Sequence, residues 1–148
     1  MDIFSKDINE LIEMIESDQI SAEQLILSHI EQIESNDNDL KAYITINKED
    51  AINKGKEIDK KKNDGIKLGA LAGIPMAVSD DISTKNIRTT LNSKMLDKYI
   101  PSFDATVIEK LKREDTVLLG KTNIREFGVG KSDNPWGTAT AVAINEAF

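Results

Sequence analysis

The 148-residue sequence contains no cysteine and a single histidine, His29. The absence of cysteine excludes disulfides, cysteine nucleophiles, zinc–thiolate sites and iron–sulfur clusters. One histidine cannot build a histidine-rich metal site, and a Ser-His-Asp triad would depend on His29 alone. His29 lies on the apolar stripe of a predicted helix, so we interpret it as a packing residue; the catalytic alternative has no evident partner residue. We therefore expect neither a metal nor a cofactor.

Aromatic residues are few, and acidic residues outnumber basic ones. The sequence has 19 Lys and Arg against 26 Asp and Glu, which gives a net charge of -7. Nucleic-acid binding requires clustered cations or aromatic stacking platforms, so we expect no direct contact with nucleic acid. No apolar run is long enough to span a membrane, and the first residues lack the pattern of a secretion signal. The sequence predicts a cytoplasmic protein, not bound to membranes, with one domain over residues 1–148.

Helices alternate with apolar strands along the chain. Apolar residues at helical spacing predict the helices, and short β-rich or wholly apolar runs predict the strands. The expected helices cover 7–17, 21–33, 47–62 and a segment capped by Asp104 with Val107, Ile108 and Leu111 on its buried face; the expected strands cover 42–46, 74–78 and 116–119. The polar run 35–39 breaks the helical pattern. The alternation indicates an α/β fold with a mostly parallel interior sheet.

Two Gly-Lys-Ser/Thr strings match the end of a phosphate-binding P-loop. They are Gly120-Lys121-Thr122 and Gly130-Lys131-Ser132. A complete P-loop needs another glycine five residues before the second one, and Asp115 and Arg125 stand at those positions. Nucleotide binding is therefore a weak alternative.

Asp80 and Asp81 directly follow an apolar strand. A pair of carboxylates could transfer protons or hold a hard cation. Adjacent residues on an extended chain point to opposite faces, however, so we predict that these two carboxylates do not converge. Capping or turn formation is the role that we expect for at least one of them.

Several unrelated short strings follow one another in a fixed order. They are Leu71-Ala72-Gly73-Ile74-Pro75-Met76-Ala77-Val78, Ile87-Arg88-Thr89-Thr90, Ser93-Lys94-Met95-Leu96, Asp104-Ala105-Thr106-Val107 and Gly120-Lys121-Thr122-Asn123. This series resembles the N-terminal part of the amidase signature family, with the closest likeness to the A subunits of aspartyl/glutamyl-tRNA amidotransferases. The resemblance covers nearly all of this chain but about the first third of a family member. It implies a partial amidase-signature fold, in which helices pack a mixed sheet of few strands.

The resemblance implies a Ser-Ser-Lys triad that hydrolyses amides. In this family a neutral lysine draws a proton through a bridging serine, which activates a second serine to attack the carboxamide carbon. The family's lysine directly follows the apolar strand, where this chain has Ser79, followed by Asp80 and Asp81. A serine has neither the basicity nor the reach of the lysine amine. We therefore expect Ser79 to fill the space of a lost catalytic group.

The two serines of the family triad are also absent from their expected places. The bridging serine belongs to a Gly/Ser-rich loop that follows the Asn-Pro-Trp string, but Trp136 is followed at once by Gly137-Thr138-Ala139. The nucleophilic serine would lie beyond Phe148. We therefore assign no catalytic residue and expect a degenerate, inactive amidase-like protein that acts as a binding or structural module.

In the resembled family, strands from later parts of the chain complete the sheet. Without them, apolar edges such as 74–78 or 116–119 would have no neighbour, and such edges promote association. We therefore expect a homo-oligomer that completes the sheet. Two alternatives remain open: an amidase completed in trans by a partner chain that supplies the serines, and a regulator that docks on the subunits of an amidotransferase.

Overall fold

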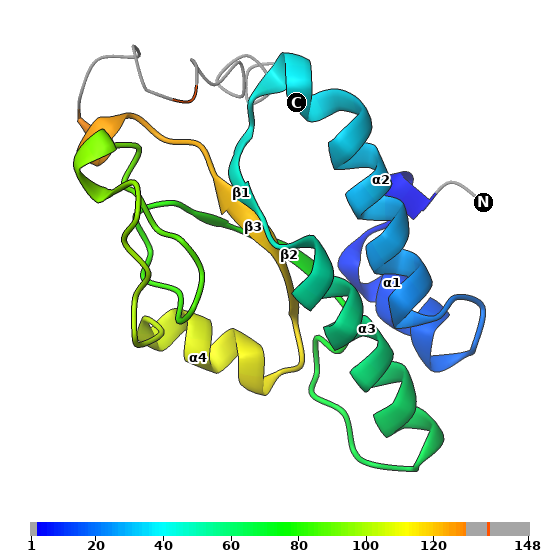
Figure 1. The fold of residues 1–148 in the computed structure, drawn as a ribbon. Coiled ribbons are helices and arrows are strands. Elements are labelled where there is room, and N and C mark those ends of the chain that lie inside the picture. Colours follow the sequence, from blue (N-terminus) through cyan, green and yellow to red (C-terminus); the bar gives the residue numbers. More distant parts are fainter. Residues whose placement is uncertain (1–2, 130–135, 137–148) are drawn as a thin grey trace.

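A small sheet lies between helices in this protein (Figure 1). The computed structural model describes residues 3–129 and residue 136. In chain order the elements are a 3-10 helix at Ile3–Ser5, α1 (Ile8–Glu16), α2 (Ala22–Leu40), β1 (Tyr43–Ile46), α3 (Lys48–Asn63), β2 (Pro75–Ser79), a 3-10 helix at Lys94–Leu96, α4 (Thr106–Arg113), β3 (Val117–Thr122) and a 3-10 helix at Glu126–Gly128. The predicted α/β class is confirmed. No helix in the described ranges is both long and apolar enough to cross a membrane.

Capping boxes start both α1 and α2. The Asp7 carboxylate accepts a hydrogen bond from the backbone N–H of Glu10, whose own carboxylate accepts from the backbone N–H of Asp7, both at 2.9 Å. Ser21 and Gln24 repeat this arrangement at α2, at 3.0 Å. Each box satisfies backbone donors that a helix start leaves unpaired, and the spacing of Ser21 and Gln24 predicted the second one.

α2 continues through the polar run 35–39, where the sequence pattern predicted a break. Ser35 and Asn36 donate side-chain hydrogen bonds to backbone carbonyls one turn earlier, at 2.8 and 2.7 Å. The polar side chains are therefore satisfied within the helix and do not turn the chain. The helix ends at Leu40 because Lys41 adopts the left-handed conformation, with a φ of 51°.

Asp104 precedes α4 but does not cap it, contrary to the prediction. Its carboxylate accepts hydrogen bonds from the backbone N–H of Lys85 and from the ammonium group of Lys112. Of the predicted apolar face of α4, Ile108 is buried, whereas Val107 is 50% exposed. Asp104 therefore ties α4 to the preceding loop.

The three strands form a mixed sheet in the order β1-β3-β2. β3 pairs antiparallel with β1 and parallel with β2, so the sheet is less parallel than predicted. The prediction that 116–119 forms an uncovered edge is wrong, because β3 is paired on both sides. Among the described residues β2 has one strand neighbour, so an open edge at 74–78 stays a prediction.

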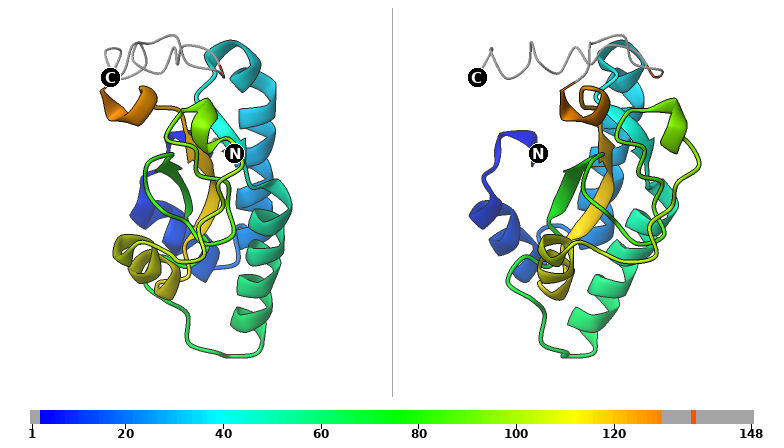
Figure 2. Two further views of the ribbon diagram at one scale, coloured as in Figure 1. Left: turned by 60° about the vertical axis from the view of Figure 1, so that its left-hand side comes forward. Right: turned by 90° about the vertical axis from the view of Figure 1, so that its left-hand side faces the viewer.

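The side chains of β3 connect the cores on the two faces of the sheet. Val117 and Leu119 pack with α2 and α3, whereas Leu118 packs with Ile108 of α4 and with Val78 of β2. This alternation follows from the two-residue period of a strand. Figure 2 shows α2 and α3 along one side of the sheet and α4 on the other. A third cluster joins α1 to α2 and to the start of β2.

Candidate functional site

Ser79 is the last residue of β2 and lies opposite Thr122 of β3. The strand ends there because the chain turns, with the backbone N–H of Ile82 donating to the carbonyl of Ser79 at 3.1 Å. The side chain is half-buried, and its hydroxyl makes no hydrogen bond to any residue of the described ranges. In that part of the chain, this hydroxyl is therefore not hydrogen-bonded to a general base.

Asp80 and Asp81 have opposite environments. Asp80 is fully buried, whereas Asp81 is exposed to solvent. One oxygen of Asp80 accepts hydrogen bonds from the backbone N–H of Thr90 at 2.9 Å, from the hydroxyl of Thr90, and from the backbone N–H of Asn92 at 3.3 Å. Asp80 therefore organises the loop that follows β2, and the two carboxylates do not share a site.

Lys121 is a buried cation whose role the sequence pattern did not reveal. It lies fully buried on β3, and its Nζ donates to the carbonyl of Ile82 and to the hydroxyls of Thr84 and Thr89, at 3.0 and 3.2 Å for the two threonines. Burial lowers its pKa to about 8, although the nearby charges of Asp80 and Asp81 oppose this shift. The three acceptors hold the ammonium group against the loop 82–89.

An irregularity in the strand pairing explains why Lys121 faces this loop. Met76 pairs with Leu118 and Ala77 with Gly120, so Leu119 is an extra residue on β3. A bulge of this kind shifts the alternation of side chains by one residue. Lys121 thus lies on the same side as Leu118, next to the loop 82–89, and strict alternation from the sequence would have placed it on the opposite face.

The P-loop alternative fails at Gly120-Lys121-Thr122, because these residues belong to β3. A Cβ at Gly120 would collide with the backbone carbonyl of Thr45 on β1, so this glycine permits close strand pairing. Gly130-Lys131-Ser132 lies outside the described residues. Within the described part of the chain, no group of three or more His, Asp or Glu side chains could hold a metal ion.

His29 lies on α2, away from Ser79 in the fold, and its contacts are those of a packing residue. Its Nδ1 lies 2.9 Å from the carbonyl of Leu25, one helical turn earlier, which makes Nδ1 the donor. The ring of Phe4 meets the imidazole edge to face, with the ring centres 5.1 Å apart. The structure thus brings His29 to neither aspartate of the candidate site.

Arg88 connects the loop after β2 to the edge strand β1. Its guanidinium donates to Asp97 at 2.6 Å, to the carbonyl of Ile44 at 3.1 Å and to the hydroxyl of Thr45 at 3.3 Å. The guanidinium carbon also lies 5.2 Å from the centre of the Trp136 ring. The shortened loop that we inferred after Trp136 lies outside the described residues, as does Phe148.

A family model described as amidase matches residues 24–146. The chain belongs to the amidase family. Among similar sequences, the A subunit of glutamyl-tRNA(Gln) amidotransferase from Thermoanaerobacter pseudethanolicus is 38% identical, over 99% of this chain and 34% of that protein. The protein of the same name from Persephonella marina is 39% identical, over 92% of this chain and 30% of that protein. The chain thus spans about a third of the amidotransferase subunits that it matches.

Solved structures of amidases share this fold. The native peptide amidase from Stenotrophomonas maltophilia superposes with a TM-score of 0.84 and 26% identity, over 92% of this chain and 29% of that chain. An inhibitor-bound vestigial protein complex, which reveals the evolutionary origins of an s-triazine catabolic enzyme, gives a TM-score of 0.83 and 29% identity, over 89% of this chain and 30% of the other. The partial amidase-signature fold inferred from the sequence is confirmed.

Proposed function

We propose that this amidase-family chain is catalytically inactive and serves as a binding or structural module akin to the amidotransferase A subunit. The observation that carries the proposal is Ser79, which stands where the family resemblance places the catalytic lysine. A serine hydroxyl is not basic enough to draw a proton from a second serine, and its side chain is shorter than that of lysine. The chain therefore lacks the group that would start the reaction.

Lys121 does not replace the missing lysine. It lies next to Thr122, the pairing partner of Ser79, but its Nζ is buried and donates to three acceptors of the loop after β2. A base must have a free lone pair that faces the reacting group. The described contacts instead support a structural role for Lys121.

Alignment lengths support a shortening of this chain within the region that matches its relatives. The match to the Thermoanaerobacter protein spans 167 positions, although this chain has 148 residues, so at least 19 positions fall opposite gaps in this chain. By contrast, a match to a Clostridium acetobutylicum protein covers 89% of the chain and spans 132 positions. This length equals the covered part of the chain, so that shorter match has no such gap. A shortening within the matched region agrees with the loss of the Gly/Ser-rich loop that we infer from the direct join of Trp136 to Gly137-Thr138-Ala139.

The proposal is tested by ammonia release from glutamine and from simple aliphatic and aromatic amides. We expect the wild-type chain to match the buffer blank. Ser79→Lys should release no ammonia either, because the serines of the triad are not restored with the lysine. Hydrolysis above the blank that disappears in Ser79→Ala would overturn the proposal.

We further propose that the chain associates with another polypeptide through the open edge of β2, with a second copy as the first candidate. Ala77 of β2 is exposed, and the segment 95–107 exposes large apolar side chains elsewhere on the surface: Met95 by 86%, Ile100 and Phe103 by 57% each, and Val107 by 50%. Unpaired edges and apolar patches favour association. The alternatives are a partner chain that completes an amidase and the subunits of an amidotransferase.

Light scattering at micromolar concentration tests the self-association. We expect a dimer or larger species, and Ala77→Lys should shift it to monomer, because lysine on an edge strand opposes strand pairing. Ala70→Lys, at an exposed alanine in the loop before β2, is the matched control and should leave the mass unchanged. A wild-type protein that is only monomeric would overturn the proposal of a homo-oligomer. If that monomer captured amidotransferase subunits, it would favour the regulator; if it captured a Ser/Gly-rich chain, it would favour an amidase completed in trans. A cytoplasmic location stays part of this proposal.

A further inference from the structure

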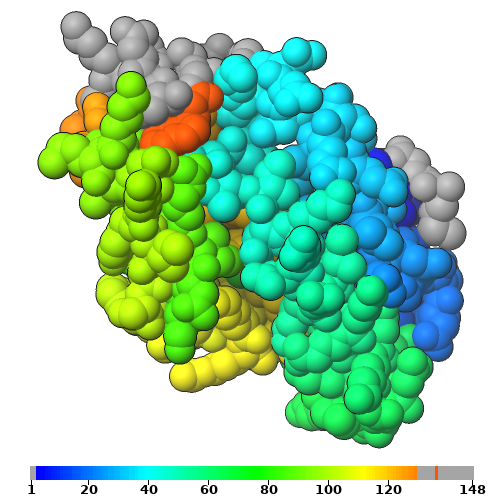
Figure 3. Space-filling model, viewed as in Figure 1, coloured from blue at the N-terminus to red at the C-terminus, as the bar shows by residue number. Residues whose placement is uncertain are grey.

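A hollow of about 420 Å³ lies between α3, the first half of β3, the loop around Asn86 and α4. Figure 3 shows the hollow on the molecular surface, with β3 visible at its bottom. Its residues on β3 and before it, Leu118 and Thr116, are at the opposite end of the strand from Thr122, which pairs with Ser79. The volume is in the range of small-molecule sites.

The bottom of the hollow is apolar. Ala51 of α3, Ile87 of the loop and Leu118 of β3 line it, and all three are buried. The side chains of Leu118 and Ile87 belong to the core beneath the hollow, so this floor is fixed by packing. A ligand here would cover the floor with a short hydrocarbon chain.

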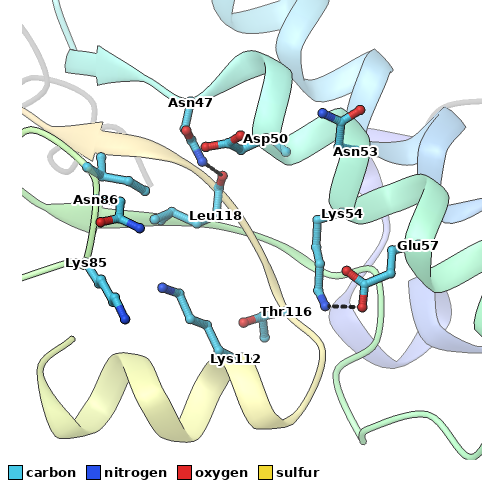
Figure 4. Close-up of a pocket in the computed structure, with 12 residues that line it drawn as sticks. Asn47, Asp50, Asn53, Lys54, Glu57, Lys85, Asn86, Lys112, Thr116 and Leu118 are labelled. Carbon is cyan, nitrogen blue, oxygen red and sulfur yellow. Dashed lines mark hydrogen bonds and ion pairs between the residues drawn. The ribbon is translucent and has the colours of Figure 1, made fainter. Parts of the chain in front are cut away.

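Charged and amide side chains surround this floor, and on the α3 side Lys54 and Glu57 form an ion pair with each other at 3.0 Å. Asn47 and Asp50 come from the start of α3, and Lys85 and Lys112 come from the loop and α4 (Figure 4). Lys112 is already paired with Asp104 at 2.8 Å. The carboxylate of Asp50 makes no hydrogen bond or ion pair with residues in the described ranges. The ammonium group of Lys85 makes none there either, although its charge helps to lower the pKa of Asp104.

We propose that this hollow binds a small ω-amino carboxylic acid, a zwitterion whose two charges are separated by a hydrocarbon chain. The ligand ammonium group pairs with Asp50, its carboxylate pairs with Lys85, and its methylene groups cover Ile87 and Leu118. An α-amino acid does not suit this arrangement, because both of its charges are attached to one carbon, whereas Asp50 and Lys85 stand on opposite sides of the floor. The side-chain amide of Asn86, beside Lys85 in the lining, adds a donor for the carboxylate.

Titration of 5-aminopentanoate into the full chain, followed by NMR chemical shifts, tests the proposal. We expect saturable, millimolar binding with shifts at Ala51, Ile87 and Leu118. Because both charged partners are exposed, Asp50→Asn and Lys85→Met should each weaken binding by about threefold to fivefold. Lys98→Met, at an exposed lysine that does not line the hollow, is the matched control and should leave the affinity unchanged.

Single-charge analogues make the test decisive. Both analogues should bind more weakly than 5-aminopentanoate. The affinity for pentanoate should be the same in wild type and Asp50→Asn, and the affinity for pentylamine should be the same in wild type and Lys85→Met. Equal affinity for pentanoate and 5-aminopentanoate would show that the hollow binds anions only, and it would overturn the proposal of a zwitterionic ligand. Absence of saturable binding, or equal weakening by Lys98→Met, would overturn the site itself.

Discussion

Replacement of Asp80 should destabilise the protein far more than replacement of its neighbour Asp81. The buried carboxylate of Asp80 accepts from two backbone N–H groups and one hydroxyl of the loop after β2. In Asp80→Ala the backbone N–H and the hydroxyl of Thr90 lose this acceptor while they remain buried, and each such loss costs about 1–2 kcal/mol. The backbone N–H of Asn92 keeps a second acceptor, the hydroxyl of Thr90, at 3.0 Å. The variant also removes the carboxylate whose charge does most to raise the pKa of Lys121 against the effect of burial. We expect Asp80→Ala to lower the free energy of unfolding by about 3–5 kcal/mol.

Urea unfolding followed by circular dichroism measures this difference. Asp81→Ala is the matched control, because Asp81 is exposed, and its effect should stay within about 0.5 kcal/mol. Asp80→Asn keeps an acceptor oxygen in place and should cost about 1–2 kcal/mol, so it gives a measurable value even where Asp80→Ala does not fold. A loss below about 1 kcal/mol in both Asp80 variants, or equal losses at the two positions, would refute the role of Asp80 as the organiser of the loop.

Three further predictions concern the same framework. The pKa of Lys121 is lowered to about 8 from 10.5, so the unfolded chain binds more protons between these pH values. The urea midpoint should therefore rise with pH across this window, by an equivalent of about 3 kcal/mol for the full shift. This rise should be absent in Lys121→Met, and parallel profiles of the two proteins would contradict the prediction. Gly120→Ala should lower the free energy of unfolding by about 1–3 kcal/mol in thermal melts, because its Cβ meets the carbonyl of Thr45; an unchanged melting temperature would show that β1 shifts freely. Asp59 of α3 accepts from the first N–H groups of α2, at 2.8 and 3.0 Å, so Asp59→Ala should cost about 1–2 kcal/mol in urea unfolding, and an unchanged midpoint would count against this contact.

Local patterns predicted most of the elements, because helix and strand periods are visible along the chain. The capping box of Ser21 and Gln24 and the strand ending at Ser79 are local in this sense. The continuation of α2 through 35–39 was missed, because Ser, Asn and Asp also form turns, and the hydrogen bonds that keep them helical do not show in a hydrophobic pattern.

The place of β3 in the sheet could not be predicted from the chain alone. Strand order depends on contacts between distant segments, so the apolar run 116–119 fits a central strand as well as an edge. The candidate site shows the same limit. The opposite environments of Asp80 and Asp81 follow from alternation, whereas the burial of Lys121 depends on the extra residue Leu119 in the pairing with β2.

The central claim is that this amidase-family chain does not hydrolyse amides, and ammonia release by the purified chain tests it most directly. With glutamine as substrate, wild type and Ser79→Ala should give the same rate as buffer alone. A wild-type rate above the blank that falls to the blank in Ser79→Ala would contradict the claim, because it would make Ser79 a working catalytic residue.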